Sequence, residues 1–97
     1  MHSMLLSSMG HRQAWGCDGF GQLGAAQFDC LADWGAELVL FGSGERLRFP
    51  QAQWLSGLYA RRIGVETMDT QAACRTYNIL AGEGRHVAAA LIVQRPA

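Results

Sequence analysis

The chain has 97 residues, enough for one hydrophobic core and too few for two. Hydrophobic residues make up 49% of it and charged residues 16%, which excludes a disordered tail. Eight basic residues, all arginine, balance eight acidic ones, so the chain lacks the basic excess that general binding to nucleic acid or anionic membranes requires. The longest apolar run, residues 87–93, is far shorter than the roughly 20 residues that span a bilayer. We therefore expect one domain over residues 1–97, cytoplasmic, without nucleic-acid binding or membrane insertion.

The first predicted elements are short. Residues 3–8 predict a strand, and the glycine-rich segment 10–24 predicts a loop. In residues 25–34, apolar side chains recur at i, i+3 and i+4, which is typical of a short amphipathic helix. Residues 37–41 (ELVLF) form a continuous apolar run, which indicates a strand buried on both faces.

The second half of the chain alternates strands and helices. Pro50 is suited to the first position of a helix, which carries a core-facing stripe and ends at Gly64. The elements predicted after it are, in order, a strand at 65–68, a helix at 70–83 closed by glycines, and a strand at 87–93. This alternation favours an α/β layered domain with right-handed crossovers between consecutive strands.

Two turns at the carboxyl ends of predicted strands form a candidate binding crevice. Gly42, Ser43 and Gly44 follow the strand at 37–41, and Asp69 and Thr70 follow the next strand. Open α/β sheets bind ligands at the carboxyl ends of their strands, so a small anionic ligand or a substrate is one alternative here. The other alternative is a flexible turn in which Asp69 or Thr70 serves only as a helix N-cap.

The helix at 70–83 carries a polar stripe and an apolar arc. At about 100° per residue, five side chains fall on one arc that we expect to pack on the sheet. They are Ala73, Cys74, Tyr77, Leu80 and Ala81. Ala72 and Ile79 lie nearly opposite, and Gln71, Arg75 and Asn78 make a continuous polar stripe. A surface helix this apolar usually contacts something on two sides, so the stripe is a candidate partner surface, although Arg75 can also be simply solvated.

No motif in the sequence predicts catalysis, a metal or another cofactor. Gly19, Gly21 and Gly24 match the spacing of the dinucleotide fingerprint, but no buried strand precedes them, as that motif requires. The three cysteines lie far apart, with no C-x-x-C pair and an odd count, which indicates reduced thiols instead of a zinc site or a disulfide scaffold. Among them, Cys74 is predicted to be a buried structural thiol.

Residues 68–85 carry the sequence MDTQAACRTYNILAGEGR, and residues 37–44 (ELVLFGSG) and 48–50 (RFP) precede it. These segments resemble the small α/β domain family that includes mitochondrial complex I assembly factor 3, the adipogenesis-associated domain protein and many bacterial proteins. The resemblance is strong over residues 34–95 and looser over residues 2–33.

The resemblance implies a three-layer fold, with a mixed β-sheet covered by helices and antiparallel strands at the N-terminus. Family members usually carry a further β segment before the position of Met1, so this segment is expected to be truncated here and the first strand to lack a pairing partner. The implied function is a non-enzymatic interaction or assembly module with protein partners. The identity of these partners and the oligomeric state of the chain stay open. Binding of a small molecule in the crevice and a purely structural product are the alternatives.

Overall fold

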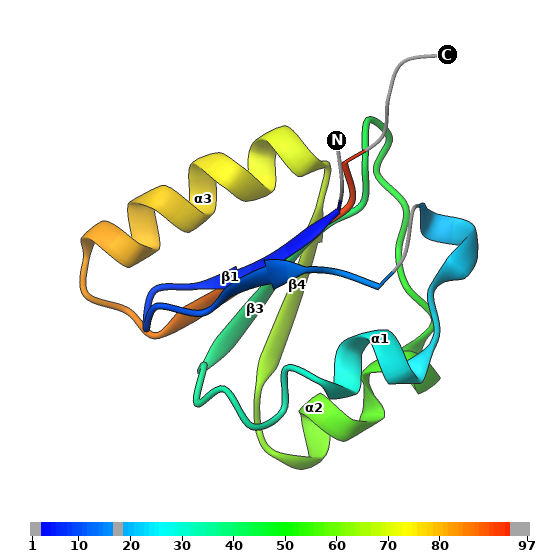
Figure 1. The fold of residues 1–97 in the computed structure, drawn as a ribbon, viewed down its shortest axis with the longest axis horizontal. Coiled ribbons are helices and arrows are strands. Elements are labelled where there is room, and N and C mark those ends of the chain that lie inside the picture. Colours follow the sequence, from blue (N-terminus) through cyan, green and yellow to red (C-terminus); the bar gives the residue numbers. More distant parts are fainter. Residues whose placement is uncertain (1–2, 17–18, 94–97) are drawn as a thin grey trace.

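Five strands form one mixed sheet in the computed structural model, which describes residues 3–16 and 19–93 (Figure 1). In chain order the elements are β1 (Met4–Ser7), β2 (Arg12–Ala14), η1 (Phe20–Gln22), α1 (Ala25–Asp29), β3 (Leu38–Gly42), η2 (Ala52–Leu55), α2 (Ser56–Ala60), β4 (Gly64–Met68), α3 (Thr70–Gly82) and β5 (Val87–Leu91). The strand order is β2-β1-β5-β3-β4. Strand β3 is parallel to β4 and β5, and β1 is antiparallel to β2 and β5. Helices lie on both faces, so the predicted three-layer mixed α/β fold is confirmed.

The centre of the sheet is apolar on both faces. All five residues of β5 are buried, and in β3 Val39, Leu40 and Phe41 are fully buried. This is the burial predicted for β3 from its continuous apolar run. Because strands buried on both faces have no solvated side, their sequences show no polar alternation.

The larger core lies between the sheet and the helices α1, η2 and α2. Phe28 of α1 is fully buried and packs edge to face against Phe41, with ring centroids 5.4 Å apart. Trp15 packs on Phe28 at the same centroid distance, 5.4 Å, and its indole Nε1 donates a hydrogen bond to the carbonyl of Gln27 at 2.8 Å. Edge-to-face aromatic contacts and burial of such large rings make this layer the main source of stability.

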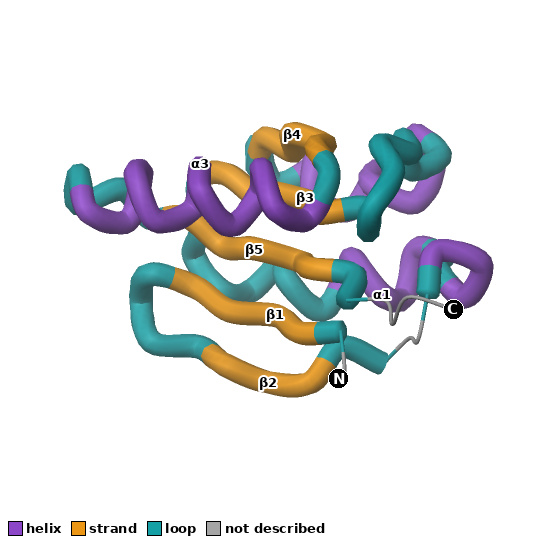
Figure 2. The backbone as a smooth tube through the Cα atoms, turned by 90° about the horizontal axis from the view of Figure 1, so that it is seen from above, coloured by secondary structure: helices purple, strands orange, loops and turns teal. Residues whose placement is uncertain are grey.

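Among the described residues, the opposite face is covered by α3 alone, and its core is smaller, with no aromatic ring fully buried in it. Ala73 of α3 packs against Ala89 and Leu91 of β5. Figure 2 shows α3 lying over the β3 and β5 side of the sheet, with β1 and β2 beside it. Small side chains in the interface allow the helix to lie close to the strands.

Two expectations about the N-terminal third are wrong. Strand β2 (Arg12–Ala14) lies inside the segment predicted to be a loop. All three of its residues are exposed, so it shows no apolar alternation to reveal it. Strand β1 was expected to lack a partner, but it pairs with β2 on one side and with β5 on the other.

Two predicted helices are shorter than expected. Helix α1 ends at Asp29, because the N–H groups of Leu31 and Ala32 bond to carbonyls only three residues back, in tighter turns. The helix predicted to begin at Pro50 begins at Ala52 as a 3-10 helix and becomes α-helical only at Ser56. Of the four residues predicted on its core-facing stripe, Leu55 and Leu58 are buried, whereas Ala52 and Tyr59 are exposed.

Both α2 and α3 end in the same backbone motif. After α3, Gly84 takes a positive φ of 81°, and the N–H groups of Gly84 and Arg85 bond to the carbonyls of Ala81 and Leu80. Glycine suits this position because it has no Cβ to clash. After α2, Arg62 takes the equivalent position with φ 60°, the only non-glycine residue with positive φ in the described part of the chain.

Candidate functional site

The two turns of the predicted crevice lie against each other at the carboxyl ends of β3 and β4. Ser43 N–H donates to the carbonyl of Met68 at 2.9 Å, and Thr70 N–H donates to the carbonyl of Gly44 at 2.9 Å. The Thr70 hydroxyl accepts from Gly44 N–H at 2.9 Å and donates to the carbonyl of Ile92 at 2.7 Å. Thr70 therefore joins both turns to the end of β5.

The Ser43 side chain is buried and fixes the loop at residues 44–50. Only 1% of Ser43 is exposed. Its Oγ donates to the carbonyl of Arg46 at 2.7 Å, lies 3.3 Å from the carbonyl oxygen of Met68, and accepts from Arg48 N–H at 3.0 Å. The hydroxyl is thus committed to the backbone of the chain itself.

Gly42 and Asp69 have structural roles at the same turns. A Cβ on Gly42 would lie 2.9 Å from Thr70 Cα and 3.0 Å from Leu91 Cδ2, so only glycine fits there without a shift. Asp69 is the N-cap of α3, and its Oδ1 accepts from Ala72 N–H at 2.9 Å. The N-cap role predicted for Asp69 or Thr70 therefore belongs to Asp69. Within residues 3–16 and 19–93, no group of three or more His, Cys, Asp or Glu side chains could hold a metal ion.

The predicted polar stripe lies on the outer surface of α3. Gln71, Arg75 and Asn78 are all exposed. Their side chains make no hydrogen bond or ion pair within the described residues. Next to them on the helix, Ile79 exposes 62% of its surface. The stripe thus offers unbonded polar groups beside an apolar side chain.

Cys74 is exposed, so its predicted burial on the sheet-facing arc is wrong. The buried line of α3 passes through Ala73 and the partly buried Tyr77, and Cys74 lies about 100° around the helix from Ala73. Burial raises the pKa of the Tyr77 hydroxyl, opposed by the charge of Arg12. Desolvation likewise raises the pKa of the exposed Cys30 thiol. Cys17 lies outside the described residues.

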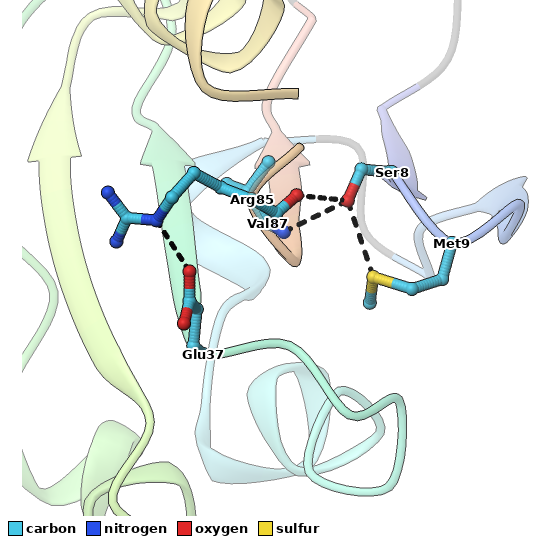
Figure 3. Close-up of polar contacts among 5 residues, drawn as sticks. All are labelled: Ser8, Met9, Glu37, Arg85 and Val87. Carbon is cyan, nitrogen blue, oxygen red and sulfur yellow. Dashed lines mark hydrogen bonds and ion pairs between the residues drawn. The ribbon is translucent and has the colours of Figure 1, made fainter. Parts of the chain in front are cut away.

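A polar cluster at the other end of the sheet was not predicted (Figure 3). Ser8 Oγ donates to the carbonyl of Arg85 at 2.7 Å and accepts from Val87 N–H at 3.1 Å, which joins β1 to the start of β5. Arg85 Nε donates to Glu37 Oε1 at 2.5 Å. Glu37 and Arg85 both lie in the segments that carry the family resemblance, but 48 positions separate them, and spacing alone does not pair them.

The Glu37–Arg85 contact predicts an acid-sensitive contribution to stability. The hydrogen bond from Arg85, and then its charge, lower the pKa of Glu37 below its ordinary value. A carboxylate with a depressed folded-state pKa stabilises the fold above its unfolded pKa of about 4.3, and loses this as pH falls through the folded value. We expect Glu37→Gln to be less stable than the parent at pH 7, with the difference vanishing at low pH. Urea midpoints from pH 7 to 2 measure it, with Glu66→Gln as the matched exposed control. A gap that stays constant with pH would contradict the assignment.

The comparison that decides the family covers almost the whole chain. A family model described as "Protein of unknown function (DUF498/DUF598)" matches residues 1–92. The chain belongs to the DUF498/DUF598 family. Complex I assembly factor 3 is among the relatives of this DUF498/DUF598 chain. The predicted resemblance to the family of that factor is therefore confirmed.

The human protein NADH dehydrogenase (ubiquinone) 1 alpha subcomplex assembly factor 3 is 46% identical over 56 residues, which cover 58% of this chain and 30% of that protein. The chain thus aligns with less than a third of that relative's length. A Bordetella parapertussis crystal structure has a TM-score of 0.86 at 36% identity, covering 93% of this chain and 77% of that one. A Bordetella pertussis protein described as a Mth938-like domain has a TM-score of 0.81 at 29% identity, covering 96% and 75%. Within the described residues of this DUF498/DUF598 chain, no helix is long and apolar enough to cross a membrane.

Proposed function

We propose that the chain is a non-enzymatic protein-binding module with an assembly-factor-like role, and that it binds a protein partner through the outer face of α3. The observation that carries the proposal is the row of Gln71, Arg75 and Ile79, which repeats every four residues and so follows one side of the helix. Asn78 lies beside this row. All four side chains are exposed, and within the described residues those of Gln71, Arg75 and Asn78 make no hydrogen bond or ion pair.

The chemistry of this face suits a protein surface. An arginine guanidinium donates paired hydrogen bonds to a carboxylate, and the amides of Gln71 and Asn78 both donate and accept. Ile79 supplies an apolar contact beside them, and burying it would remove its exposed surface from water. The partner we propose therefore presents a carboxylate next to an apolar patch. The name of the human relative, an assembly factor, supports this role, and we place the activity in the cytoplasm.

The alternative, a small anionic ligand at the two turns, has less support. The Ser43 and Thr70 hydroxyls and the Asp69 carboxylate are bonded within the chain. Both hydroxyl protons are thus donated within the chain, and an anion could accept them only after these bonds break, while the Asp69 carboxylate has no proton to donate.

Arg75→Ala tests the proposal. We expect the free energy of unfolding, obtained from thermal melts, to change by less than about 0.5 kcal/mol, as is usual for substitutions of exposed residues. The partner is identified by mass spectrometry of proteins retained by the tagged parent chain, then purified, and its Kd is measured by calorimetry. Arg75→Ala should weaken binding at least tenfold, and Arg12→Ala, an exposed arginine on β2, should not. Equal affinities would remove α3 from the interface, and a tight anion that raises the melting temperature would favour the alternative.

A further inference from the structure

The loop at residues 44–50 exposes two large apolar side chains. Leu47 is 54% exposed and Phe49 is 70% exposed. Phe49 is the most exposed large hydrophobic residue in the described part of the chain. In Figure 1 this loop, drawn in green after β3, runs along the outside of the molecule before it enters η2 and α2.

This loop is fixed from below. The buried Ser43 hydroxyl accepts from Arg48 N–H and donates to the carbonyl of Arg46, so it closes the base of the loop. The Arg48 guanidinium lies over the Phe20 ring, 5.6 Å from its centroid. The apolar side chains are therefore held outward by contacts already made in the free chain, which reduces the ordering cost of binding.

The loop itself carries a small basic excess. Residues 44–50 contain two arginines, Arg46 and Arg48, and one glutamate, Glu45, in a chain whose net charge is zero. The Arg46 side chain makes no ion pair within the described residues. Its free guanidinium is complementary to a carboxylate.

The backbone of the loop discriminates between a protein and a lipid occupant. The N–H and C=O groups of Leu47 and Phe49 have no hydrogen-bond partner within the described residues. In the hydrocarbon of a membrane each such group would stay unsatisfied, at high cost. A protein surface can satisfy them.

We propose that residues 44–50 form a docking loop for a protein partner that presents an apolar pocket rimmed by carboxylates. Leu47 and Phe49 fill the pocket, while Arg46 faces the acidic rim. This inference rests on the proposed function and adds a second binding surface to it. That surface lies at the end of the sheet where β3 finishes.

A random 12-residue peptide library displayed on phage serves as the probe. It is selected on the immobilised full chain, with the double variant Leu47→Asp/Phe49→Asp in solution to remove peptides that bind elsewhere. We expect enriched peptides that combine apolar and acidic residues. Their affinity should fall at least tenfold on Phe49→Asp and on Arg46→Glu, and stay unchanged on Tyr59→Asp, an exposed aromatic control on α2.

The absence of enriched peptides, or peptides whose affinity does not depend on Phe49, would overturn the inference. If the chain sediments with phosphatidylglycerol vesicles and Phe49→Asp abolishes this, the loop binds lipid. If the chain forms a dimer that Phe49→Asp dissociates, the loop binds a second copy. Either result overturns the inference. Phe49→Ser replaces Phe49→Asp if the latter lowers the melting temperature. If Arg75→Ala binds the partner weakly and Phe49→Asp binds it normally, the proposed function stands and the loop has no part in it.

Discussion

Phe28→Ala is expected to destabilise the domain by about 3–5 kcal/mol, the usual loss for a fully buried phenylalanine. No part of the Phe28 residue is exposed, and its ring contacts those of Trp15 and Phe41 edge to face. It also stacks on Trp54, with ring centroids 6.4 Å apart. Alanine would leave a cavity lined by these rings. The bond from Trp15 to the carbonyl of Gln27 limits how far that ring can move into the cavity.

Urea unfolding followed by tryptophan fluorescence and by circular dichroism measures this loss. Domains of this size have a total stability of about 5–15 kcal/mol, so Phe28→Ala should be close to unfolding at 37 °C. Phe28→Leu retains most of the volume and is the control, with a smaller expected loss. A midpoint for Phe28→Ala within error of the parent would show that α1 contributes little to the core.

Gly42→Ala is expected to cost about 1–3 kcal/mol through overpacking. The added methyl would lie 2.9 Å from Thr70 Cα, a backbone atom at the first turn of α3, and 3.0 Å from Thr70 Oγ1. Relieving the contact means moving Thr70, which is bonded to Gly44 and Ile92.

Gly82→Ala is the matched control, because nothing lies within 4 Å of a Cβ at that position of α3. Alanine is also the better helix former, so this control should be neutral or stabilising. Chemical denaturation of both variants gives the comparison. Equal stabilities for Gly42→Ala and Gly82→Ala would show that the turn is free to relax around a side chain.

The central strands and α3 could be predicted because their local signals agree with their tertiary environment. The run at β3 is apolar throughout, and the strand is buried on both faces. Asp69 precedes α3 as its N-cap, and Gly84 follows it with the positive φ that glycine favours. Such agreement of capping, periodicity and burial makes a segment predictable.

Strand β2 and the side of α3 that carries Cys74 could not be predicted, for different reasons. The three residues of β2 are exposed, and their strand conformation depends on pairing with β1. Burial of Cys74 depends on how much of the helix surface the sheet covers, and α3 lies mainly over β3 and β5. A helical wheel shows which residues share a side but does not show how wide the buried strip is.

The candidate surfaces divide in the same way. Exposure of Gln71, Arg75 and Asn78 followed from helical periodicity. The exposure of Leu47 and Phe49 did not, because apolar side chains in a loop are normally expected to turn inward. Here the Ser43 hydroxyl bonds the backbone of Arg46 and Arg48, on either side of Leu47, and the sequence pattern gives no sign of this closure.

The unequal cores on the two sides of the sheet have a consequence for dynamics. Helix α3 packs on a cluster with only three buried residues, Ala73, Ala89 and Leu91, whereas the opposite layer contains the larger aromatic cluster around Phe28. Local opening of α3 therefore requires less free energy than global unfolding, and its amides should exchange with solvent by a sub-global route. A ligand on the outer face of α3 would suppress this opening, so slowed hydrogen exchange confined to α3 would locate a bound partner even before its structure is known.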